Sequence, residues 1–263
     1  MSAVSAVPVV GVIVTHNSQE FLPELLASIQ AQIQQLDHLV VIDDNSTDQT
    51  NQILAQHAII PTRATSKATN LTTRIAQNFQ QGVRQAPPNS IVILGDHDDT
   101  WLPHRVQHQV AAFQREPLLA MLASDGRISD PNKIEQTLRT TFPIPVDWDA
   151  MNKRNQFAFA LRHSIATGGA SAIKVSNFTS HLTVPSGWLH DRWWSLAATA
   201  LGRMALDDEI AINYRITTTQ QVGLDSASQQ EGTQQWLLAQ ARDFPNTAAK
   251  SVELMKLAIL ALR

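Results

Sequence analysis

Short apolar runs alternate with amphipathic stretches through the first half of the chain. The runs that predict buried strands are Val7–Thr15, Leu39–Ile42 and Ile91–Leu94, with a shorter one near Ile59-Ile60. Between these runs, apolar residues at helical spacing predict helices over Gln19–Gln34, Thr47–His57, Leu71–Gln85 and Pro103–Arg115. Strands that alternate with helices predict an α/β fold, in which a mixed, mainly parallel sheet carries helices on both faces.

The second half of the chain has a less regular pattern. A strand over Leu118–Ala123 precedes a polar stretch, Asp125–Asn155, whose prolines predict loops lying over the sheet. Beyond it, the pattern predicts a helix over Gly187–Leu201 and a strand over Glu209–Tyr214. The apolar residues of Trp236–Leu262 predict a helix that closes the core, and the basic residues among them leave a helix on a membrane surface as the alternative.

Composition narrows the class of protein. The chain has 263 residues and a formal net charge of -3, so it lacks the basic field expected of a nucleic-acid-binding protein. It contains no cysteine, which excludes disulfides, thiolate metal sites and a cysteine nucleophile. Residues 1–8 lack the basic start and cleavage site of a signal peptide, and the apolar run that follows is too short to span a bilayer, so we expect a cytoplasmic protein.

Three carboxylates, those of Asp96, Asp98 and Asp99, follow the apolar run Ile91–Leu94 within a few positions. A core cannot hold such a cluster unpaired, so these acids must meet water, basic side chains or a cation. Ligands of a parallel sheet bind beyond the carboxyl ends of its strands, where Mg²⁺ or Mn²⁺ takes one or two carboxylates together with substrate phosphates. The motif therefore predicts a metal–diphosphate site. A solvated acidic loop is the alternative for this motif taken alone.

Five motifs occur in order on the predicted strand ends and helices. They are VIVTHN from Val12, VIDDNSTD from Val41, GDHDDTWLP from Gly95, GGA from Gly168 and HDRWW from His190, the last followed by Tyr214-Arg215. In this combination the chain resembles the family 2 glycosyltransferases of the GT-A fold over nearly its whole length up to Gly223. The third and fifth motifs are most similar to the branch described as rhamnosyltransferase-like.

The resemblance implies how the chain is divided. A GT-A glycosyltransferase domain would span residues 1–223, with a nucleotide-sugar-binding half (1–115) and an acceptor-binding half (116–223). A C-terminal helical extension (224–263) would follow. The fold implied is a Rossmann-like nucleotide-diphospho-sugar transferase fold.

The resemblance also implies a nucleotide-binding role for several residues of the first half. Asp44 would accept a hydrogen bond from the imide N–H of uracil or thymine, since an ionised carboxylate only accepts. Its alternative is to cap the next helix, together with or in place of the aspartate before it. Thr15 and Asn17 would line the base, with an ordinary turn as the alternative. Arg74 and Asn78 would face the nucleotide from one helix, and a plain surface position is the alternative for Arg74.

The acidic motif would hold the ribose through Asp96 and a divalent cation, Mn²⁺ or Mg²⁺, through Asp98 with Asp96 beside it. Asp99 would orient the loop or form an ion pair with a nearby basic side chain. Arg215 would reach the diphosphate. In the branch a histidine usually follows Tyr-Arg closely, but Thr217 stands there in this chain. The resemblance therefore implies that metal binding is weaker here or relies on donor phosphates and water.

The acceptor side would centre on Asp191, which matches the family's general base. It would take the proton from the acceptor hydroxyl as that oxygen attacks the anomeric carbon. The indole of Trp193 would stack on a sugar, and Gly168 and Gly169 would let the backbone approach the donor or acceptor sugar. The alternatives are a helix-dipole partner for Asp191, a core position for Trp193 and a simple turn for the glycines.

The expected function is an inverting, metal-dependent glycosyltransferase. It would move a sugar from a UDP- or dTDP-linked nucleotide-diphospho-sugar donor to a hydroxyl of a glycan or lipid-linked acceptor, in cell-surface polysaccharide synthesis. It would work in the cytoplasm or peripherally at the inner membrane face. One rival is a catalytically weak GT-A-like module that binds nucleotide sugar or glycan without turnover, suggested by Thr217. A nucleotidyltransferase is disfavoured because His16–Glu20 lacks a Gly-rich basic loop.

Overall fold

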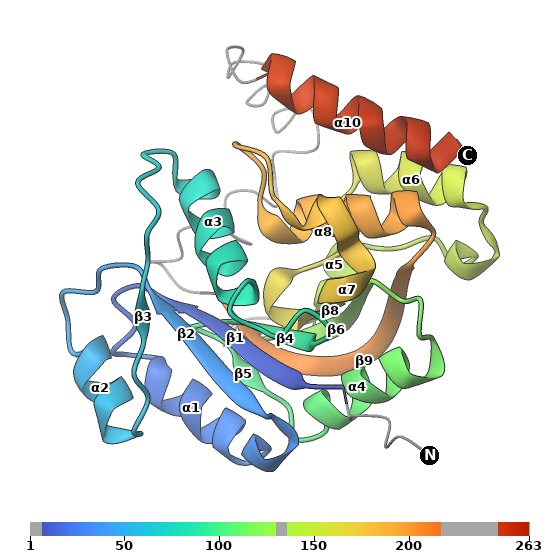
Figure 1. Ribbon diagram of the computed structural model, residues 1–263. Coiled ribbons are helices and arrows are strands. Elements are labelled where there is room, and N and C mark those ends of the chain that lie inside the picture. The colour runs from blue at the N-terminus through green and yellow to red at the C-terminus, as the bar shows by residue number, and fades with distance from the viewer. Residues whose placement is uncertain (1–6, 130–135, 217–246, 263) are drawn as a thin grey trace, which may run out of the picture.

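The computed structural model describes residues 7–129, 136–216 and 247–262 (Figure 1). Its first half contains parallel strands in the spatial order β3-β2-β1-β4, namely β1 (Val9–Thr15), β2 (His38–Asp43), β3 (Thr62–Arg63) and β4 (Ile91–Asp96). The helices between them are α1 (Leu22–Gln30), α2 (Thr50–Gln56) and α3 (Leu71–Val83). The short strand predicted at Ile59-Ile60 lies instead at β3, because the chain pairs with the end of β2 only from Thr62 onward.

The sheet continues beyond β4 with strands of both directions. The order runs through β8 (Ser171–Lys174), β6 (Met121–Ser129) and β9 (Met204–Arg215) to β5 (Thr100–Trp101), and β7 (Gln136–Thr137) pairs with β6 off this path. β8 is antiparallel to both β4 and β6, whereas β6 and β9 are parallel. This mixed, mainly parallel sheet confirms the predicted fold class.

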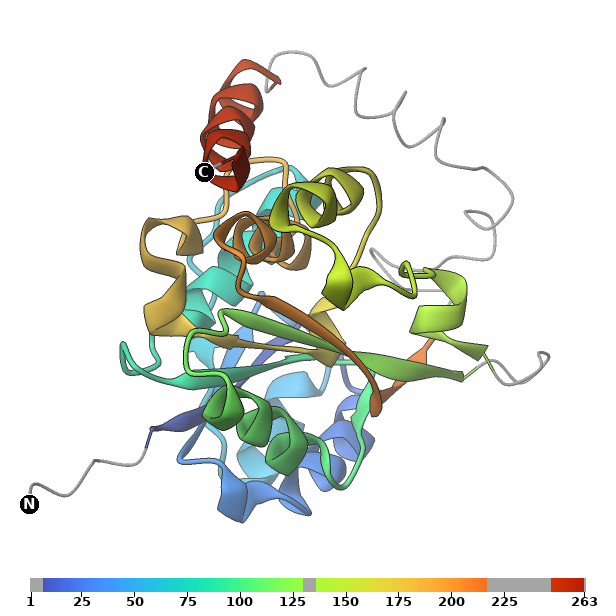
Figure 2. The same ribbon diagram turned by 90° about the vertical axis from the view of Figure 1, so that its right-hand side faces the viewer.

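Helices cover both faces of the sheet (Figures 1 and 2). α1, α2 and α4 (Arg105–Arg115) pack on one face, and α3, α6 (Lys153–Arg162) and α8 (His190–Leu201) lie on the other. Alternate residues of β1 enter the two cores: Val10 and Val12 face α3, while Val9 and Ile13 face α1. A strand that is apolar on both faces must be covered on both, which is why β1 lies in the middle of the parallel group.

The polar stretch after Ala123 is more ordered than predicted. β6 continues to Ser129, α5 (Leu138–Thr141) and the 3-10 turn η2 (Trp148–Ala150) follow, and α6 begins at Lys153, so the prediction of loops over Asp125–Asn155 was wrong at both ends. β6 can carry polar residues because Asp125 accepts the N–H groups of Gly126 and Arg139. The short strand β8 and α7 (Val175–Phe178) were also missed.

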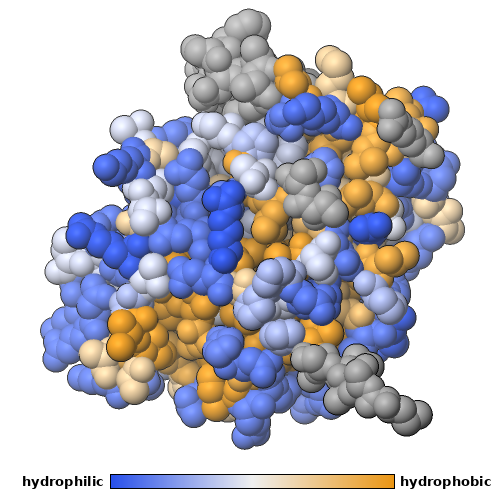
Figure 3. Space-filling view, in the orientation of Figure 1, coloured by the Kyte–Doolittle hydropathy of each residue, from blue (hydrophilic) through white to orange (hydrophobic). Residues whose placement is uncertain are grey.

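The C-terminal helix α10 (Thr247–Leu262) closes one side of the core, as predicted. Leu257 and Ala261 are buried against α6 and α8, and Lys153 of α6 donates a hydrogen bond to the Leu260 carbonyl (3.1 Å). Apolar residues also line its outer side (Figure 3): Val252, Met255, Ile259 and Leu262. None of the helices in the described ranges is long and apolar enough to cross a membrane. Thr217 and residues 224–246 of the predicted extension lie outside those ranges.

Candidate active site

Three strands end side by side at one edge of the sheet. β1 lies in the middle, and its register pairs Thr15 with Asp43 at the end of β2 and Val14 with Asp96 at the end of β4. β8 is antiparallel to β4, so the turn that precedes it, η3 (Gly168–Ala170), lies at the same edge. Strand order and register therefore bring together polar residues that are far apart in the sequence.

The two aspartates after β2 have different partners. Asp43 accepts hydrogen bonds from the Thr15 hydroxyl (2.9 Å) and from the Ser46 backbone N–H (3.1 Å). The Oδ2 atom of Asp44 lies 3.0 Å from Nε of Arg74, although the N–H is not aligned for a hydrogen bond. Asp43 thus holds the loop after β2 in place, which leaves Asp44 as the carboxylate that faces α3.

The loop after β1 is held by Asn17. Its φ is 49°, in the left-handed region that Asn tolerates better than most residues. Its N–H donates to the Ser46 hydroxyl (2.9 Å), and its side-chain oxygen accepts the N–H of Thr47 (2.9 Å). Thr15 is buried, and its hydroxyl donates a hydrogen bond to Asp43. Both side chains shape the loops at the strand ends, and their contact with a base stays a prediction.

Arg74 and Asn78 lie one turn apart on α3, on the same face of the helix. The Arg74 side chain is partly exposed beside Asp44. Asn78 is fully buried, and neither of its amide atoms has a hydrogen-bond partner among the described residues. The structure therefore brings Arg74 to the predicted site and places Asn78 in the interior behind it.

The acidic motif after β4 is crowded. Asp99 is 1% exposed; its Oδ1 accepts the Arg215 backbone N–H (3.1 Å), and its Oδ2 has no partner in the described ranges. Burial and the charges of Asp98 and Asp96 raise the pKa of Asp99 well above its usual value. Burial and the charges of Asp98 and Asp191 likewise raise the pKa of Asp96 to about 7. The side chains around these acids therefore stabilise the ionised carboxylates poorly.

Arg105, from the first turn of α4, lies beneath this motif. It is 1% exposed, it donates to the Leu94 carbonyl of β4 (2.6 Å), and its guanidinium lies 4.4 Å from the centre of the Trp101 ring. Burial lowers its pKa to about 9, while the charges of Asp99 and Asp96 act in the opposite direction. Arg105 is the buried counter-charge of the acidic motif, a role that the sequence analysis did not assign.

Gln109, one turn later, extends this support to η3. Its amide donates to the Ala170 carbonyl (2.9 Å) and its oxygen accepts from Nε of Arg105 (3.3 Å). The signal for both residues was in the sequence: they occupy inward positions of an amphipathic helix, next to the buried Val106 and Phe113. A polar pair at inward positions predicts a buried network.

Side chains from other elements lie close to the backbone of the two glycines of η3. A Cβ on Gly169 would lie 2.7 Å from one carboxylate oxygen of Asp96 and from one of Asp99. A Cβ on Gly168 would lie 2.5 Å from Nε2 of His190. These distances are too short for carbon, so a side chain at either position would force these carboxylates or the His190 ring to move. The sequence predicted that these glycines let the backbone approach a sugar. In the structure, protein side chains lie close to the backbone at both glycines. Contact of either glycine with a sugar stays a prediction.

Asp191 lies in the first turn of α8, where the helix dipole favours an anion. Its Oδ1 accepts the N–H of Arg192 (2.6 Å), and its Oδ2 accepts the N–H of Gly168 (3.0 Å). It remains partly exposed, and its charge is one cause of the raised pKa of Asp96. The predicted base thus lies near the acidic motif, joined to it through the Gly168-Gly169 backbone.

His190 is buried beside this base. Its ring stacks on Phe79 (3.8 Å between centroids) and meets the Trp194 ring edge-on (5.3 Å). Neither ring nitrogen has a hydrogen-bond partner in the described ranges, and burial lowers the pKa of His190 to about 4, against the opposing charge of Asp191. A neutral imidazole therefore packs under Gly168.

Replacing His190 by Met is expected to make the protein less sensitive to acid. An unfolded histidine takes up a proton near pH 6.5, whereas folded His190 does so only near pH 4. Between these values the unfolded state binds more protons, so the parent loses on the order of 3 kcal/mol of stability as the pH falls through this window. The variant is expected to lack this loss.

Urea unfolding of both proteins between about pH 7 and pH 4.5 measures the difference. A comparison with the parent is needed because the raised pKa values of Asp96 and Asp99 act in the opposite direction in both proteins. His57→Met, at an exposed histidine, is the matched control. If His190→Met and the parent lose stability in parallel, the buried neutral imidazole is refuted.

The prediction that Trp193 stacks on a sugar was wrong. Trp193 is 1% exposed, and its indole N–H donates to the His181 carbonyl (3.0 Å). α8 is buried along nearly its whole length, so its large aromatic residues fill the core between α3 and α6 rather than facing a ligand. The core position was the alternative considered for this residue.

Arg215 lies at the end of β9, and its side chain turns toward α1. Its guanidinium lies 2.7 Å from the Glu24 carboxylate and 4.8 Å from the centre of the Phe21 ring. Its backbone N–H donates a hydrogen bond to the acidic motif, at Asp99 (3.1 Å). The Glu24 carboxylate is largely exposed, and ion pairs of this kind contribute little. A contact of Arg215 with a diphosphate would require this pair to open, and it stays a prediction.

The acids of this edge suit a divalent cation. Asp98 is 8% exposed and accepts no hydrogen bond from the described residues, and Asp99 has one carboxylate oxygen without a partner. Hard oxygen ligands with excess negative charge fit Mg²⁺ or Mn²⁺. Within the described ranges, no three His, Asp or Glu side chains are arranged to hold a metal by themselves. Asp96 and Asp98 would therefore share the ion with substrate phosphates or water.

Comparison with known proteins gives one family. The model of glycosyl transferase family 2 matches residues 12–181, which is more than half of the chain and includes the ends of β1, β2 and β4 and the η3 turn. A search of curated proteins found no match.

Solved structures of low sequence identity share the fold. A crystal structure of S. aureus TarS (residues 1–349) with UDP-GlcNAc has a TM-score of 0.60 and 16% identity, over 82% of this chain and 62% of that one. Glucosyl-3-phosphoglycerate synthase from Mycobacterium tuberculosis, with Mn²⁺ and UDP-glucose, has a TM-score of 0.55 and 13% identity, over 81% and 73%. The chain thus spans about 62% of the TarS structure.

Proposed function

The chain belongs to glycosyl transferase family 2, and on this premise we propose that it transfers a sugar from a nucleotide-diphosphate donor to an acceptor hydroxyl. One observation carries the proposal: Gly169 lies against Asp96 and Asp99, while the N–H of the adjacent Gly168 binds Asp191. Acids suited to a metal–diphosphate group and a carboxylate suited to an acceptor hydroxyl thus lie against neighbouring residues of one turn, η3. Glycosyl transfer needs both groups within the span of one sugar.

The donor is proposed to be UDP- or dTDP-linked. Asp44 would accept the imide N–H of the pyrimidine, and Asp96 would bind the ribose. When bound, a divalent cation held by Asp96 and Asp98 would neutralise charge on the leaving diphosphate. The uridine nucleotides in the TarS and glucosyl-3-phosphoglycerate synthase structures, and the Mn²⁺ in the latter, support this choice.

The reaction is proposed to be a single displacement. The acceptor oxygen forms a bond to the anomeric carbon while the bond from that carbon to the diphosphate oxygen breaks, and the electron pair leaves with the diphosphate. Asp191 takes the acceptor proton. The two N–H groups that it accepts, from Gly168 and Arg192, hold its carboxylate in place. Displacement from the opposite face inverts the anomeric configuration.

Finer parts of the proposal rest on the sequence. The motifs from Gly95 and His190 support the rhamnosyltransferase-like branch and a glycan or lipid-linked acceptor in cell-surface polysaccharide synthesis. The exposed apolar residues of α10 support a peripheral contact with the inner membrane face, and a cytoplasmic location stays a prediction. The division into a GT-A domain (1–223) and a C-terminal extension (224–263) belongs to the same proposal.

A donor panel tests the function. UDP-, dTDP- and GDP-sugars are compared by thermal shift with Mn²⁺, and nucleotide release is then followed with candidate acceptors. UDP or dTDP is expected to raise Tm, because a ligand that binds only the folded state stabilises it. Acceptor-dependent nucleotide release supports the enzyme, whereas binding without release supports the rival binding module.

Replacing Asp44 by Ala is expected to weaken UDP or dTDP about ten-fold or more, because a hydrogen bond to a charged group contributes about 1.5 to 3 kcal/mol. Calorimetric titration of parent and variant measures the change. Asp149→Ala, at an exposed acid in η2, is the control and is expected to bind like the parent. A parent that binds GDP better than both pyrimidine nucleotides would show the assignment of Asp44 to be wrong.

A further inference from the structure

The segment that leads into α8, residues 183–189, lies against α3, and we call it the α8 leader. The backbone N–H of Val184 donates to the side-chain oxygen of Gln80 (2.7 Å), and the N–H of Gly187 donates to the Thr73 hydroxyl (2.8 Å). Both acceptors are buried side chains of α3. They lie about two turns apart on one face of the helix, so the leader is fixed to α3 at two points.

The contact with Thr73 is suited to both of its partners. The Thr73 hydroxyl donates its proton to the side chain of Asn70, the N-cap of α3 (3.1 Å), which leaves its lone pairs to accept from Gly187. Gly187 has a φ of 78°, in the left-handed region that glycine adopts without strain. A hydroxyl at position 73 thus connects the first turn of α3 to the leader.

The leader is held at both of its ends. Just before it, the Leu182 carbonyl accepts the indole N–H of Trp194 from α8 (2.9 Å). Just after it, the ring of His190 stacks on Phe79 of α3. Asp191 lies only two residues beyond the end of the leader. The place at which the leader docks on α3 therefore determines where the first turn of α8 carries the Asp191 carboxylate.

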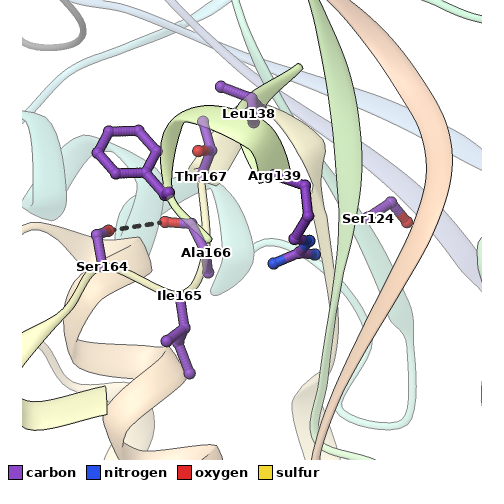
Figure 4. Close-up of a pocket in the computed structure, with 8 residues that line it drawn as sticks. Ser124, Leu138, Arg139, Ser164, Ile165, Ala166 and Thr167 are labelled. Carbon is purple, nitrogen blue, oxygen red and sulfur yellow. Dashed lines mark hydrogen bonds between the residues drawn. The ribbon is translucent and has the colours of Figure 1, made fainter. Parts of the chain in front are cut away.

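On its other side, Asp191 meets the turn η3. The N–H of Gly168 donates to Asp191 (3.0 Å), and the adjacent Gly169 lies against the acidic motif. The segment that leads into this turn has a hydrogen bond of its own, from the Ser164 hydroxyl to the Ala166 carbonyl (3.3 Å; Figure 4). η3 therefore holds the candidate base relative to the acidic motif, and the α8 leader holds it relative to α3.

α3 is also the helix that faces the nucleotide side of the site. Arg74 directly follows Thr73, and its Nε lies 3.0 Å from the carboxylate of Asp44, the residue proposed to bind the pyrimidine. Adjacent residues of α3 thus contact the nucleotide side and the α8 leader. A shift of α8 along α3 would change the distance between donor and base, and a misplacement of about 1 Å can lower a rate about 10²-fold.

We propose that Thr73 and Gln80 are positioning residues of the transferase, which fix Asp191 at the distance from the bound donor that transfer requires. They act through the α8 leader. The inference rests on the proposed function and adds two residues to the machinery of the reaction. Loss of either contact is expected to lower kcat and to leave donor binding unchanged, because the nucleotide side of α3 stays intact.

Thr73→Val tests this, because valine keeps the shape of the side chain and removes the hydroxyl. Nucleotide release is followed with water as the acceptor, from the UDP- or dTDP-sugar that raises the Tm of the parent most. The kcat of the variant is expected to fall about 10- to 100-fold. The KM for the donor should stay close to that of the parent, since it reports binding when chemistry is slow. Thr73→Ser restores the hydroxyl and is expected to restore kcat.

The backbone amide signals of Gly168 and Arg192 give a readout that needs no turnover, because both N–H groups donate to the Asp191 carboxylate. In NMR spectra of the full chain, both signals are expected to shift in Thr73→Val and to keep their parental positions in Thr73→Ser. Gln80→Met removes the second acceptor and is expected to act like Thr73→Val, so the test does not depend on the folding of one variant.

Thr199→Val is the matched control. It removes a buried hydroxyl from α8 itself, where that hydroxyl donates to the Ser195 carbonyl of the same helix (2.7 Å). This variant is expected to have parental kcat and parental amide signals, and its Tm measures the effect on stability of losing a buried hydroxyl.

Two results would overturn the inference: parental kcat with unmoved Gly168 and Arg192 signals in folded Thr73→Val and Gln80→Met, or an equal loss of kcat in Thr199→Val. The failure of the proposed function has a different signature, since the parent itself would then release no nucleotide from any donor. In that case the amide signals still decide whether Thr73 and Gln80 position Asp191.

Discussion

Replacing Asp191 by Asn is expected to lower kcat by about 10²- to 10⁴-fold, the usual contribution of a general base, while donor affinity stays close to that of the parent. Asn keeps the size of the side chain and removes the oxygen that would take the acceptor proton. One of the two hydrogen bonds from Gly168 and Arg192 is lost as well, which costs about 1 kcal/mol of stability. Steady-state kinetics and UDP titration of the folded variant separate the two effects.

Asp149→Asn, the same substitution at an exposed acid, is the control for Asp191 and is expected to have parental kcat. Proton NMR of the product gives a second readout, because attack on the face opposite the diphosphate inverts the anomeric configuration. A product with the donor's configuration, or an Asp191→Asn variant with parental kcat, would exclude Asp191 as the base of a single displacement.

Replacing Asp98 by Ala is expected to abolish the Mn²⁺-dependent part of UDP binding. Asp98 and Asp96 are the carboxylates proposed to hold the ion, and without Asp98 too few protein ligands remain for a cation that otherwise depends on phosphates and water. The fold should survive, since no described residue donates a hydrogen bond to the Asp98 side chain. Calorimetry of UDP with and without Mn²⁺ measures the loss.

Glu116→Ala, at an exposed acid beyond α4, removes the same charge far from the strand ends and should leave the Mn²⁺ effect intact. Circular dichroism and Tm of both variants report on the fold. If Asp98→Ala and the parent have equal affinity for UDP with Mn²⁺, the ion is held elsewhere and the metal assignment is wrong.

The sequence alone determined the outline of the fold and the edge on which the site lies. Alternating strand and helix patterns are local, and crossover connections force β1, β2 and β4 to be parallel. Acids that follow such strands must then meet at one edge, so the proximity of Asp96 to the loop after β2 could be predicted. The helix α6 and the strand β8 could not, because a few buried residues such as Phe157 and Ala160 produce too weak a pattern.

The role of each side chain depended on its partners across the fold. Asp43 and Asp44 are adjacent and chemically identical. Asp43 accepts a hydrogen bond from the Thr15 hydroxyl, whereas Asp44 faces Arg74. Trp193 looked equally suited to a sugar or to the core, and the surrounding helices bury it. Such choices depend on contacts between residues distant in sequence, which local patterns do not encode.

Charge balance was likewise decided only by the tertiary structure. The sequence predicted that the acids after β4 must meet water, basic side chains or a cation, and the packing of α4 against β4 places Arg105 beneath them. The same holds for Gly169, whose missing side chain is explained by the carboxylates of Asp96 and Asp99. Sequence patterns report which residues are buried or polar along each element. The distances between elements, which determine the electrostatics of the site, arise only when the sheet and its two helix layers have packed together.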